Sequence, residues 1–242
     1  MAIQILSIDE VSKHFGGILA INYLSFNVNE GDRIGVMGPN GAGKTTLLNV
    51  ITGEYKPDSG RIRFMGKDIT GYPPHKICRL GLARTYQIPQ PWVNLTALQN
   101  VVVAAEYGRG VGMVEAKRLA PQALELTKLM AKKDILAKNL AAITRKRLEL
   151  ARALATNPKM LLIDEVAAGL TDEELPEMLE ILQKIHEAGI TYILIEHVMR
   201  VMVKAVDRIV VVDKGVKIAE GQPNEVMEDR KVVEAYLGIE EV

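Results

Sequence analysis

The chain has 242 residues, and 30 Lys and Arg balance 30 Asp and Glu, so its formal net charge is zero. This balance argues against a generally basic nucleic-acid binder. With 48% hydrophobic and 25% charged residues, the composition is that of an ordinary globular protein with one large domain or a core and a subdomain. No apolar stretch approaches the roughly 18 residues of a membrane span. The N-terminus lacks a secretory pattern, so a cytoplasmic location is expected.

Short β-like runs alternate with helical ones, which is typical of a mainly parallel sheet flanked by helices. Strands are predicted at 3–9, 22–28, 33–37, 61–65, 160–164, 192–195 and 208–212. The first, second and fourth of these are expected to form an antiparallel piece. From 88 to 157 the strand signal disappears, which predicts an inserted helical subdomain. Its helices are predicted at 97–106, 114–130 and 145–155.

The strongest chemical signal is the segment Gly38-Pro39-Asn40-Gly41-Ala42-Gly43-Lys44-Thr45, which fits the phosphate-loop pattern G-x-x-x-x-G-K-S/T. It lies between the predicted strand 33–37 and a helix that ends at Gly53. Glycines let backbone N–H groups turn toward a phosphate, and the helix N-terminus adds a favourable dipole. Lys44 would reach the β- and γ-phosphates, and the Thr45 hydroxyl would ligate Mg²⁺. The nucleotide-binding candidates are Gly38, Asn40, Gly41, Ala42, Gly43, Lys44, Thr45 and Thr46.

A second motif, Met160-Leu161-Leu162-Ile163-Asp164-Glu165, is an apolar strand that ends in two carboxylates. In a parallel sheet the carboxyl ends of the strands share one edge with the phosphate loop, so Asp164 is expected to approach Mg²⁺. Glu165 is placed to polarise a water for in-line attack on the γ-phosphate. By itself, such a pair of carboxylates could also be the ordinary polar end of a strand. Beside the phosphate loop, the catalytic interpretation is favoured.

With the residues around them, these two motifs resemble the nucleotide-binding subunits of ABC transporters, and the resemblance covers the whole chain. It implies one ABC ATPase domain over 1–242, with ATP and Mg²⁺ as cofactors. The implied fold class is α/β: a P-loop NTPase core with a mainly parallel sheet, an N-terminal antiparallel β subdomain and an inserted α-helical subdomain. The core would comprise 1–87 and 158–242, and the helical subdomain 88–157.

The resemblance also assigns roles to three single residues. Phe15 matches the aromatic residue that stacks on adenine, although an ordinary core Phe is the alternative. Gln87 matches the glutamine that touches Mg²⁺ and the attacking water, which makes it both a metal ligand and a catalytic candidate. His197, after the predicted strand 192–195, matches the histidine that contacts the γ-phosphate.

Four further segments are similar to the ATPases of branched-chain amino-acid importers. They are Pro73-Pro74-His75-Lys76-Ile77, Gly81 to Gln87, Ala167-Ala168-Gly169-Leu170 and Val232 to Gly238. The implied partners are transmembrane permease subunits, a second ATPase subunit in a homo- or heterodimer and, indirectly, an extracytoplasmic solute-binding protein. The subunit would then be cytoplasmic and peripheral, held at the inner face of the membrane by the permease.

The chain departs from the family where the signature L-S-G/Y-G-Q is expected, because it reads Leu140-Ala141-Ala142-Ile143-Thr144. In the family this loop binds the γ-phosphate of ATP held by the opposite subunit. Ala141 has no hydroxyl to donate, and Ile143 puts a β-branched side chain where backbone should approach a phosphate. We therefore hypothesise a degenerate signature, with one competent and one degenerate site in a heterodimer, or an altered segment whose repair restores activity.

Two interpretations stay open beside the transport ATPase: a non-transport ABC ATPase and a nucleotide-dependent regulatory module. Clamp-type members usually carry two ATPase modules or a long coiled-coil insertion, and nucleotide sensors often lose the carboxylate that Glu165 retains. Trp92, in the proline-rich segment 88–93, is expected either to anchor a permease helix or to be partly buried for structural reasons.

Overall fold

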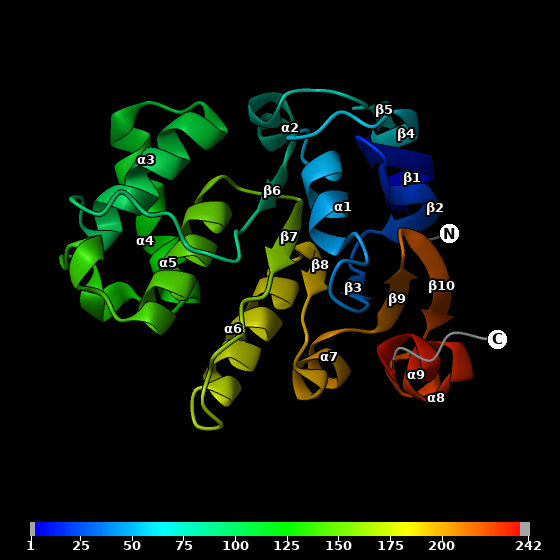
Figure 1. Ribbon diagram of the computed structural model, residues 1–242. Helices are drawn as coiled ribbons and strands as arrows, with labels where there is room; N and C mark the ends of the chain where they lie inside the picture. The colour runs from blue at the N-terminus through cyan, green and yellow to red at the C-terminus, as the bar shows by residue number, and fades with distance from the viewer. Residues whose placement is uncertain (1–2, 238–242) are drawn as a thin grey trace. The chain divides into compact units, whose positions relative to one another are not determined.

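The computed structural model describes residues 3–237; Met1, Ala2 and 238–242, which include Gly238 of the tail motif, lie outside the described part of the chain. The chain divides into two compact units, and Figure 1 labels the helices and strands of both. The first unit comprises residues up to Pro74 and from Thr191 onward, and the second comprises His75–Ile190.

An antiparallel sheet of the first unit is built on a long hairpin. Its strands, in the order β2-β1-β4-β5, are β2 (Ile18–Asn29), β1 (Gln4–Phe15), β4 (Ser59–Phe64) and β5 (Lys67–Asp68). The predicted antiparallel piece is confirmed, but β1 and β2 are longer than predicted. The reason is the tight turn Gly16-Gly17, with Gly16 at φ 58°, which keeps Phe15 paired with Ile18.

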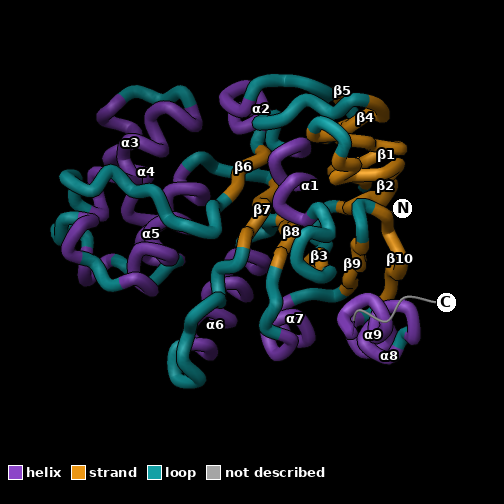
Figure 2. Tube along the Cα trace, viewed as in Figure 1, coloured by secondary structure: helices purple, strands orange, loops and turns teal. Residues whose placement is uncertain are grey.

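The other sheet strands of the first unit lie in the order β10-β9-β3-β8 (Figure 2). They are β10 (Val216–Gly221), β9 (Arg208–Asp213), β3 (Arg33–Met37) and β8 (Thr191–Ile195). β3 pairs in parallel with both β8 and β9, whereas β10 is antiparallel to β9. β10 was not predicted, because it is a half-exposed edge strand without an apolar run. The helices of this unit are α1 (Lys44–Ile51), α7 (Met199–Ala205), α8 (Pro223–Glu228) and α9 (Arg230–Leu237).

The second unit holds the parallel strand pair β6 (Leu82–Arg84) and β7 (Met160–Asp164). β6 was not predicted, since three residues carry no periodicity. Its main helices are α3 (Ala97–Arg109), α4 (Met113–Leu126), α5 (Ala142–Ala155) and α6 (Leu175–Glu187). The shorter helices are α2 (Pro74–Leu80), η1 (Met130–Lys132) and η2 (Ala137–Asn139). Helices α3, α4 and α5 pack on one another, as the apolar periodicity predicts.

Two predicted helix starts are shifted. The sequence Thr171-Asp172-Glu173-Glu174 has the pattern of a capping box and predicts a helix start there. Its bonds form, since the Thr171 N–H donates to Glu174 Oε2 at 3.0 Å and the Glu174 N–H donates to Thr171 Oγ1 at 3.3 Å. They close a turn, however, and α6 begins only at Leu175. α5 begins at Ala142, three residues before the predicted start, so three of the five residues of the expected signature loop are helical.

None of the helices in the described part of the chain has the length and apolarity that a bilayer crossing requires.

Candidate functional site

The phosphate-loop segment connects β3 to α1 in the first unit. The Lys44 ammonium is almost fully buried and donates to Gly38 O at 2.7 Å and Pro39 O at 2.9 Å. Glycine is required at both ends of the loop. A Cβ on Gly38 would lie 1.9 Å from Val212 O, and a Cβ on Gly43 would lie 2.3 Å from Ala20 O. The loop is therefore pressed against β9 at its first glycine and against β2 of the antiparallel sheet at its last.

The opposite side of the loop is open. Asn40, Gly41 and Thr45 are exposed, whereas Ala42 is buried and Thr46 is intermediate. Thr45 lies in the first turn of α1, where backbone N–H groups have no intrahelical partner. A loop with this geometry offers N–H donors and a hydroxyl to an anion.

His197 lies at the same edge of the sheet as the phosphate loop. β3 and β8 are parallel with Val36 opposite Ile195, so Gly38 and His197 each follow this pair by two residues. His197 is exposed, and its backbone N–H donates to Glu196 Oε2 at 3.3 Å. The structure thus brings the predicted histidine to the edge at which ligands of such sheets bind.

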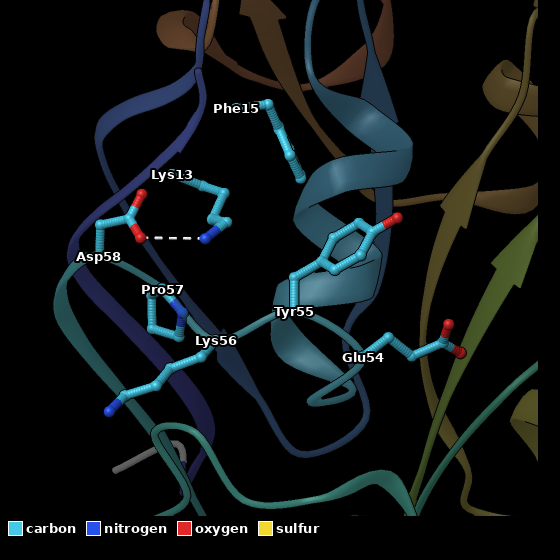
Figure 3. Close-up of a pocket in the computed structure, with 7 residues that line it drawn as sticks. All are labelled: Lys13, Phe15, Glu54, Tyr55, Lys56, Pro57 and Asp58. Atoms are coloured by element: carbon cyan, nitrogen blue, oxygen red, sulfur yellow. Dashed lines mark hydrogen bonds and ion pairs between the residues drawn. The ribbon is translucent and has the colours of Figure 1, made fainter. Parts of the chain in front are cut away.

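Phe15 ends β1 at the rim of a pocket of about 480 Å³ (Figure 3). Its ring is 41% exposed and meets the ring of Tyr55 edge-on, with centroids 5.1 Å apart. The Lys13 ammonium lies 5.5 Å from the Phe15 centroid and pairs with Asp58 at 2.9 Å. An exposed aromatic at this place is available for stacking, which a core Phe would not be.

Asp58 fixes the end of β1 from which Phe15 projects. It accepts from the His14 backbone N–H at 2.6 Å as well as from Lys13. The His14 N–H and the Lys13 ammonium lower the pKa of Asp58 to about 2, so the carboxylate stays charged at all physiological pH values. Sequence reasoning missed Asp58 and Tyr55, because their role depends on the return of the chain after α1 and not on a local pattern.

The catalytic candidates of the second unit lie together. β6 and β7 are parallel, and Gln87 and Glu165 each follow one of these strands. The Gln87 amide nitrogen donates to Glu165 Oε2 at 2.6 Å. The glutamine and the carboxylate predicted to act on one water are therefore direct neighbours.

Asp164 ends β7 in a buried position, only 3% exposed. Its backbone N–H donates to Thr85 Oγ1 at 3.2 Å, and an Arg84 amino group lies 3.5 Å from Asp164 Oδ2. Arg84 is itself buried at its side chain and stacks on Tyr86, 4.5 Å from the ring centroid. A buried carboxylate needs such a cation to offset its desolvation. Arg84 was missed because one Arg has no pattern.

Lys146 on α5 is a further contact that sequence reasoning missed. Its ammonium donates to Glu165 O at 3.0 Å and to Ala168 O at 2.5 Å. Glu165 has φ 47°, a left-handed conformation that costs a non-glycine residue about 1–3 kcal/mol. Lys146 thus holds the strained turn that carries the candidate catalytic carboxylate. The signal in the sequence that could have found Lys146 is a lysine near the start of the predicted helix 145–155.

The predicted signature segment spans the start of α5. Ala141 is its N-cap residue, without a side-chain cap bond, and Thr144 is 2% exposed with its hydroxyl 3.2 Å from the Lys132 ammonium. Arg145 folds back and donates to Leu140 O at 2.9 Å and to Lys138 O at 2.8 Å. Thr144 is thus engaged within the second unit, whereas Ala141 and Ala142 are exposed.

Trp92 lies on a loop that Asn100 fixes. Asn100 is fully buried; its Oδ1 accepts from the Trp92 N–H at 2.8 Å, and its Nδ2 donates to Trp92 O at 3.1 Å. The Trp92 ring is 45% exposed and the Arg152 guanidinium stacks 4.5 Å from its centroid. The ring is thus half exposed on a rigid loop.

Replacing Asn100 with Ala is expected to lower the free energy of unfolding by about 2–4 kcal/mol, because buried backbone groups lose their partners. Urea unfolding measures this loss. Asn94→Ala, at an exposed position three residues from Ala97, is the matched control and is expected to change stability by less than about 0.5 kcal/mol. Equal stability of the two variants would contradict the assigned role of Asn100.

The comparison with known proteins agrees with this geometry. The family model described as "ABC transporter" matches residues 21–168, and one described as "Branched-chain amino acid ATP-binding cassette transporter" matches 216–242. A probable branched-chain amino acid transport ATP-binding protein LivG of Archaeoglobus fulgidus is 39% identical over 98% of this chain and 97% of its own. A high-affinity branched-chain amino acid transport ATP-binding protein, BraF of Pseudomonas aeruginosa, is 36% identical over 98% of this chain and 99% of its own.

Solved structures show the same fold. The ADP conformation of an ATP-binding cassette of an ABC transporter superposes with a TM-score of 0.88 at 35% identity, covering 98% of this chain and 99% of that one. This confirms the predicted fold class of antiparallel sheet, mainly parallel sheet and helical subdomain. A dimeric cassette bound to ADP and Pi superposes with a TM-score of 0.81 at 25% identity, covering 90% and 98%. The chain therefore belongs to the ABC transporter family, as an ATP-binding ATPase subunit coupled to transport that resembles the branched-chain amino-acid transport ATP-binding proteins.

Proposed function

We propose that this chain hydrolyses ATP to power an importer of branched-chain or related amino acids. The observation that carries the proposal is the phosphate loop between β3 and α1, with its buried Lys44, in a chain whose whole length matches branched-chain amino acid transport ATP-binding proteins. No residue of the chain need touch the amino acid, so the substrate class rests on those relatives.

The residue roles follow from chemistry and position. Phe15 stacks on adenine, and the segment from Gly38 to Thr46 wraps the phosphates with its N–H groups while Lys44 neutralises their charge. Glu165 orients and polarises the attacking water, helped by Gln87, whose amide nitrogen lies 2.6 Å from the carboxylate. His197 contacts the γ-phosphate. Lys146 keeps the Glu165 turn in place.

Mg²⁺ fits the donor set that the chain offers. Thr45 presents a hydroxyl and Asp164 a carboxylate; the Gln87 amide turns its nitrogen to Glu165, so its oxygen is the atom that it can offer to a cation. These are hard oxygen donors, few in number, as expected for an ion that also binds substrate phosphates. The described residues contain no cluster of three or more His, Cys, Asp or Glu that could hold a metal. When bound, Mg²⁺ would neutralise charge on the phosphate oxygens.

The proposed assembly is peripheral to a membrane. Two ATPase subunits would attach to transmembrane permease subunits at the inner face of the membrane, fed by an extracytoplasmic solute-binding protein. Trp92, half exposed on its rigid loop, would anchor a permease helix. Residues 88–157 would form the helical subdomain and 1–87 with 158–242 the nucleotide-binding core.

Deleting the gene in its own host tests the transport function. Uptake of radiolabelled leucine and valine is expected to fall to background and to return with the wild-type gene, but not with Lys44→Ala. Unchanged uptake after deletion, together with absence of membrane proteins that co-purify with the tagged chain, would instead favour a non-transport ATPase or a regulatory module.

We further propose that segment 140–144 is a degenerate signature. Its support is the missing side-chain cap at Ala141 and the engaged, buried Thr144. A hydrogen bond to a charged group is worth about 1.5–3 kcal/mol, so a lost serine contact would weaken phosphate binding across a dimer by about 10- to 100-fold. A heterodimer with a partner of normal signature would keep one competent site.

Restoring the signature tests this idea. The triple variant Ala141→Ser, Ile143→Gly and Thr144→Gln is expected to raise the ATP hydrolysis rate of the isolated chain at least about tenfold, because one restored charged hydrogen bond is worth that factor. Phosphate release under saturating ATP measures it. Asn139→Ala, at an exposed position just before the segment, is the control and should leave the rate unchanged. A wild-type chain that hydrolyses ATP cooperatively at a rate the triple variant does not exceed would refute the degenerate signature.

A further inference from the structure

The C-terminal helix contacts the residue at which the phosphate loop begins. The Gly38 backbone N–H donates to the Tyr236 hydroxyl at 2.9 Å, and both residues belong to the first unit. Tyr236 lies on α9, near the end of the described chain and far in sequence from the loop. None of the sequence motifs discussed above gives this tyrosine a role at the nucleotide.

The backbone of Gly38 has little freedom to move. Its φ is 151°, and a Cβ there would lie 1.9 Å from Val212 O, so β9 presses on it from one side. The parallel ladder between β3 and β8 reaches only to Val36 opposite Ile195. The Gly38 N–H therefore follows the last strand pair, and Tyr236 supplies its acceptor, as buried backbone donors require.

The same sheet holds the loop at a second point. The Gly215 N–H, in the turn between β9 and β10, donates to Ala42 O at 3.0 Å. With the Lys44 ammonium on Gly38 O and Pro39 O, these bonds fix one side of the loop backbone. The N–H groups on its exposed side are then oriented in advance for a phosphate, which lowers the entropic cost of binding.

Helix α9 is docked so that Tyr236 reaches the loop. Val232 is 3% exposed, whereas Val233 is 42%, Tyr236 40% and Leu237 66% exposed, and α9 packs on α8 and β10. Tyr236 follows Val232 by four residues and so shares its face of the helix. Partial burial raises the pKa of Tyr236, so the hydroxyl stays neutral and does not repel a nucleotide.

We propose that Tyr236 is a positioning residue of the phosphate loop, through which the C-terminal helix contributes to nucleotide affinity. The inference rests on the proposed function. Residues 216–242 match the branched-chain cassette model, whereas the general ABC transporter match ends at 168. A residue in the segment that matches the branched-chain cassette model thus contacts the phosphate loop, which lies in the segment that matches the general ABC transporter model.

Tyr236→Phe tests the proposal, because it removes only the hydroxyl. Titration of the full chain with ADP and with ATP is expected to give a Kd about 3- to 10-fold higher than wild type for both nucleotides, since the loop wraps the phosphates that they share. The Gly38 amide is expected to exchange its hydrogen faster, with the thermal midpoint of the nucleotide-free chain unchanged. Tyr107→Phe, at a tyrosine that is 69% exposed on α3, is the matched control and should bind like wild type.

The outcomes distinguish failure of the proposed function from failure of the role assigned to Tyr236. If the wild-type chain binds no nucleotide, the proposed function fails and the inference with it. If wild type binds and Tyr236→Phe binds equally tightly, only the inference fails. It also fails if affinity drops together with the thermal midpoint and with faster exchange throughout the chain, because Tyr236 would then be a structural residue only.

Discussion

Glu165→Gln is expected to reduce the ATP hydrolysis rate by at least about 100-fold, the lower range of general-base contributions. The substitution keeps the size of the side chain and leaves Gln87 a hydrogen-bond partner, so the turn held by Lys146 should persist. ATP affinity should stay within about threefold of wild type, because a base acts in the transition state and not in ground-state binding. Phosphate release and equilibrium ATP binding measure the two effects separately.

The ATP hydrolysis rate should be measured in two sequence backgrounds, because a degenerate signature is expected to lower the rate of the wild-type chain. Glu165→Gln is introduced into the wild-type chain and into the triple variant whose signature is restored at positions 141, 143 and 144. The second background is also expected to trap an ATP-bound dimer, visible by size-exclusion chromatography. Glu173→Gln, at an exposed glutamate on the following turn, is the control. A Glu165→Gln chain that hydrolyses ATP like this control would refute the catalytic role.

The functional residues could be predicted from the sequence where they lie next to one another in a motif. The phosphate loop has a pattern that few other structures require, and the apolar run before Asp164 predicts a buried strand, so both lie where expected at the ends of β3 and β7. Gln87 and His197 could be placed only through family resemblance. The structure then puts Gln87 beside Glu165 and His197 at the same sheet edge as Gly38.

Contacts made between distant segments were not predictable. By sequence pattern, Lys146, Arg84 and Tyr236 are ordinary helix and strand residues. Their roles follow from contacts made by the fold, with Glu165, Asp164 and Gly38 respectively. The errors in the elements have local causes. β6 is too short for a period, β10 is too polar, and the bonds between Thr171 and Glu174 close a turn before α6 begins.

Lys44→Ala is expected to weaken nucleotide binding severely, because the Lys44 ammonium has two roles. The ammonium supplies charge to the phosphates, and it also ties the start of α1 to the start of the loop through Gly38 O and Pro39 O. Loss of a charged, buried donor costs about 1.5–3 kcal/mol for each contact, so the combined loss should raise the Kd for ATP by at least about 100-fold. Isothermal titration with ATP and with ADP measures it.

Lys117→Ala, at an exposed lysine on α4, is the matched control and should bind ATP like wild type. The comparison with Tyr236→Phe is informative, because that change leaves the charge in place and disturbs only the loop backbone. Lys44→Ala should therefore weaken ATP binding much more than Tyr236→Phe does, and its effect should shrink at high salt, which screens charge. An effect of Lys44→Ala no larger than that of Tyr236→Phe would mean that the ammonium serves the loop and not the phosphates.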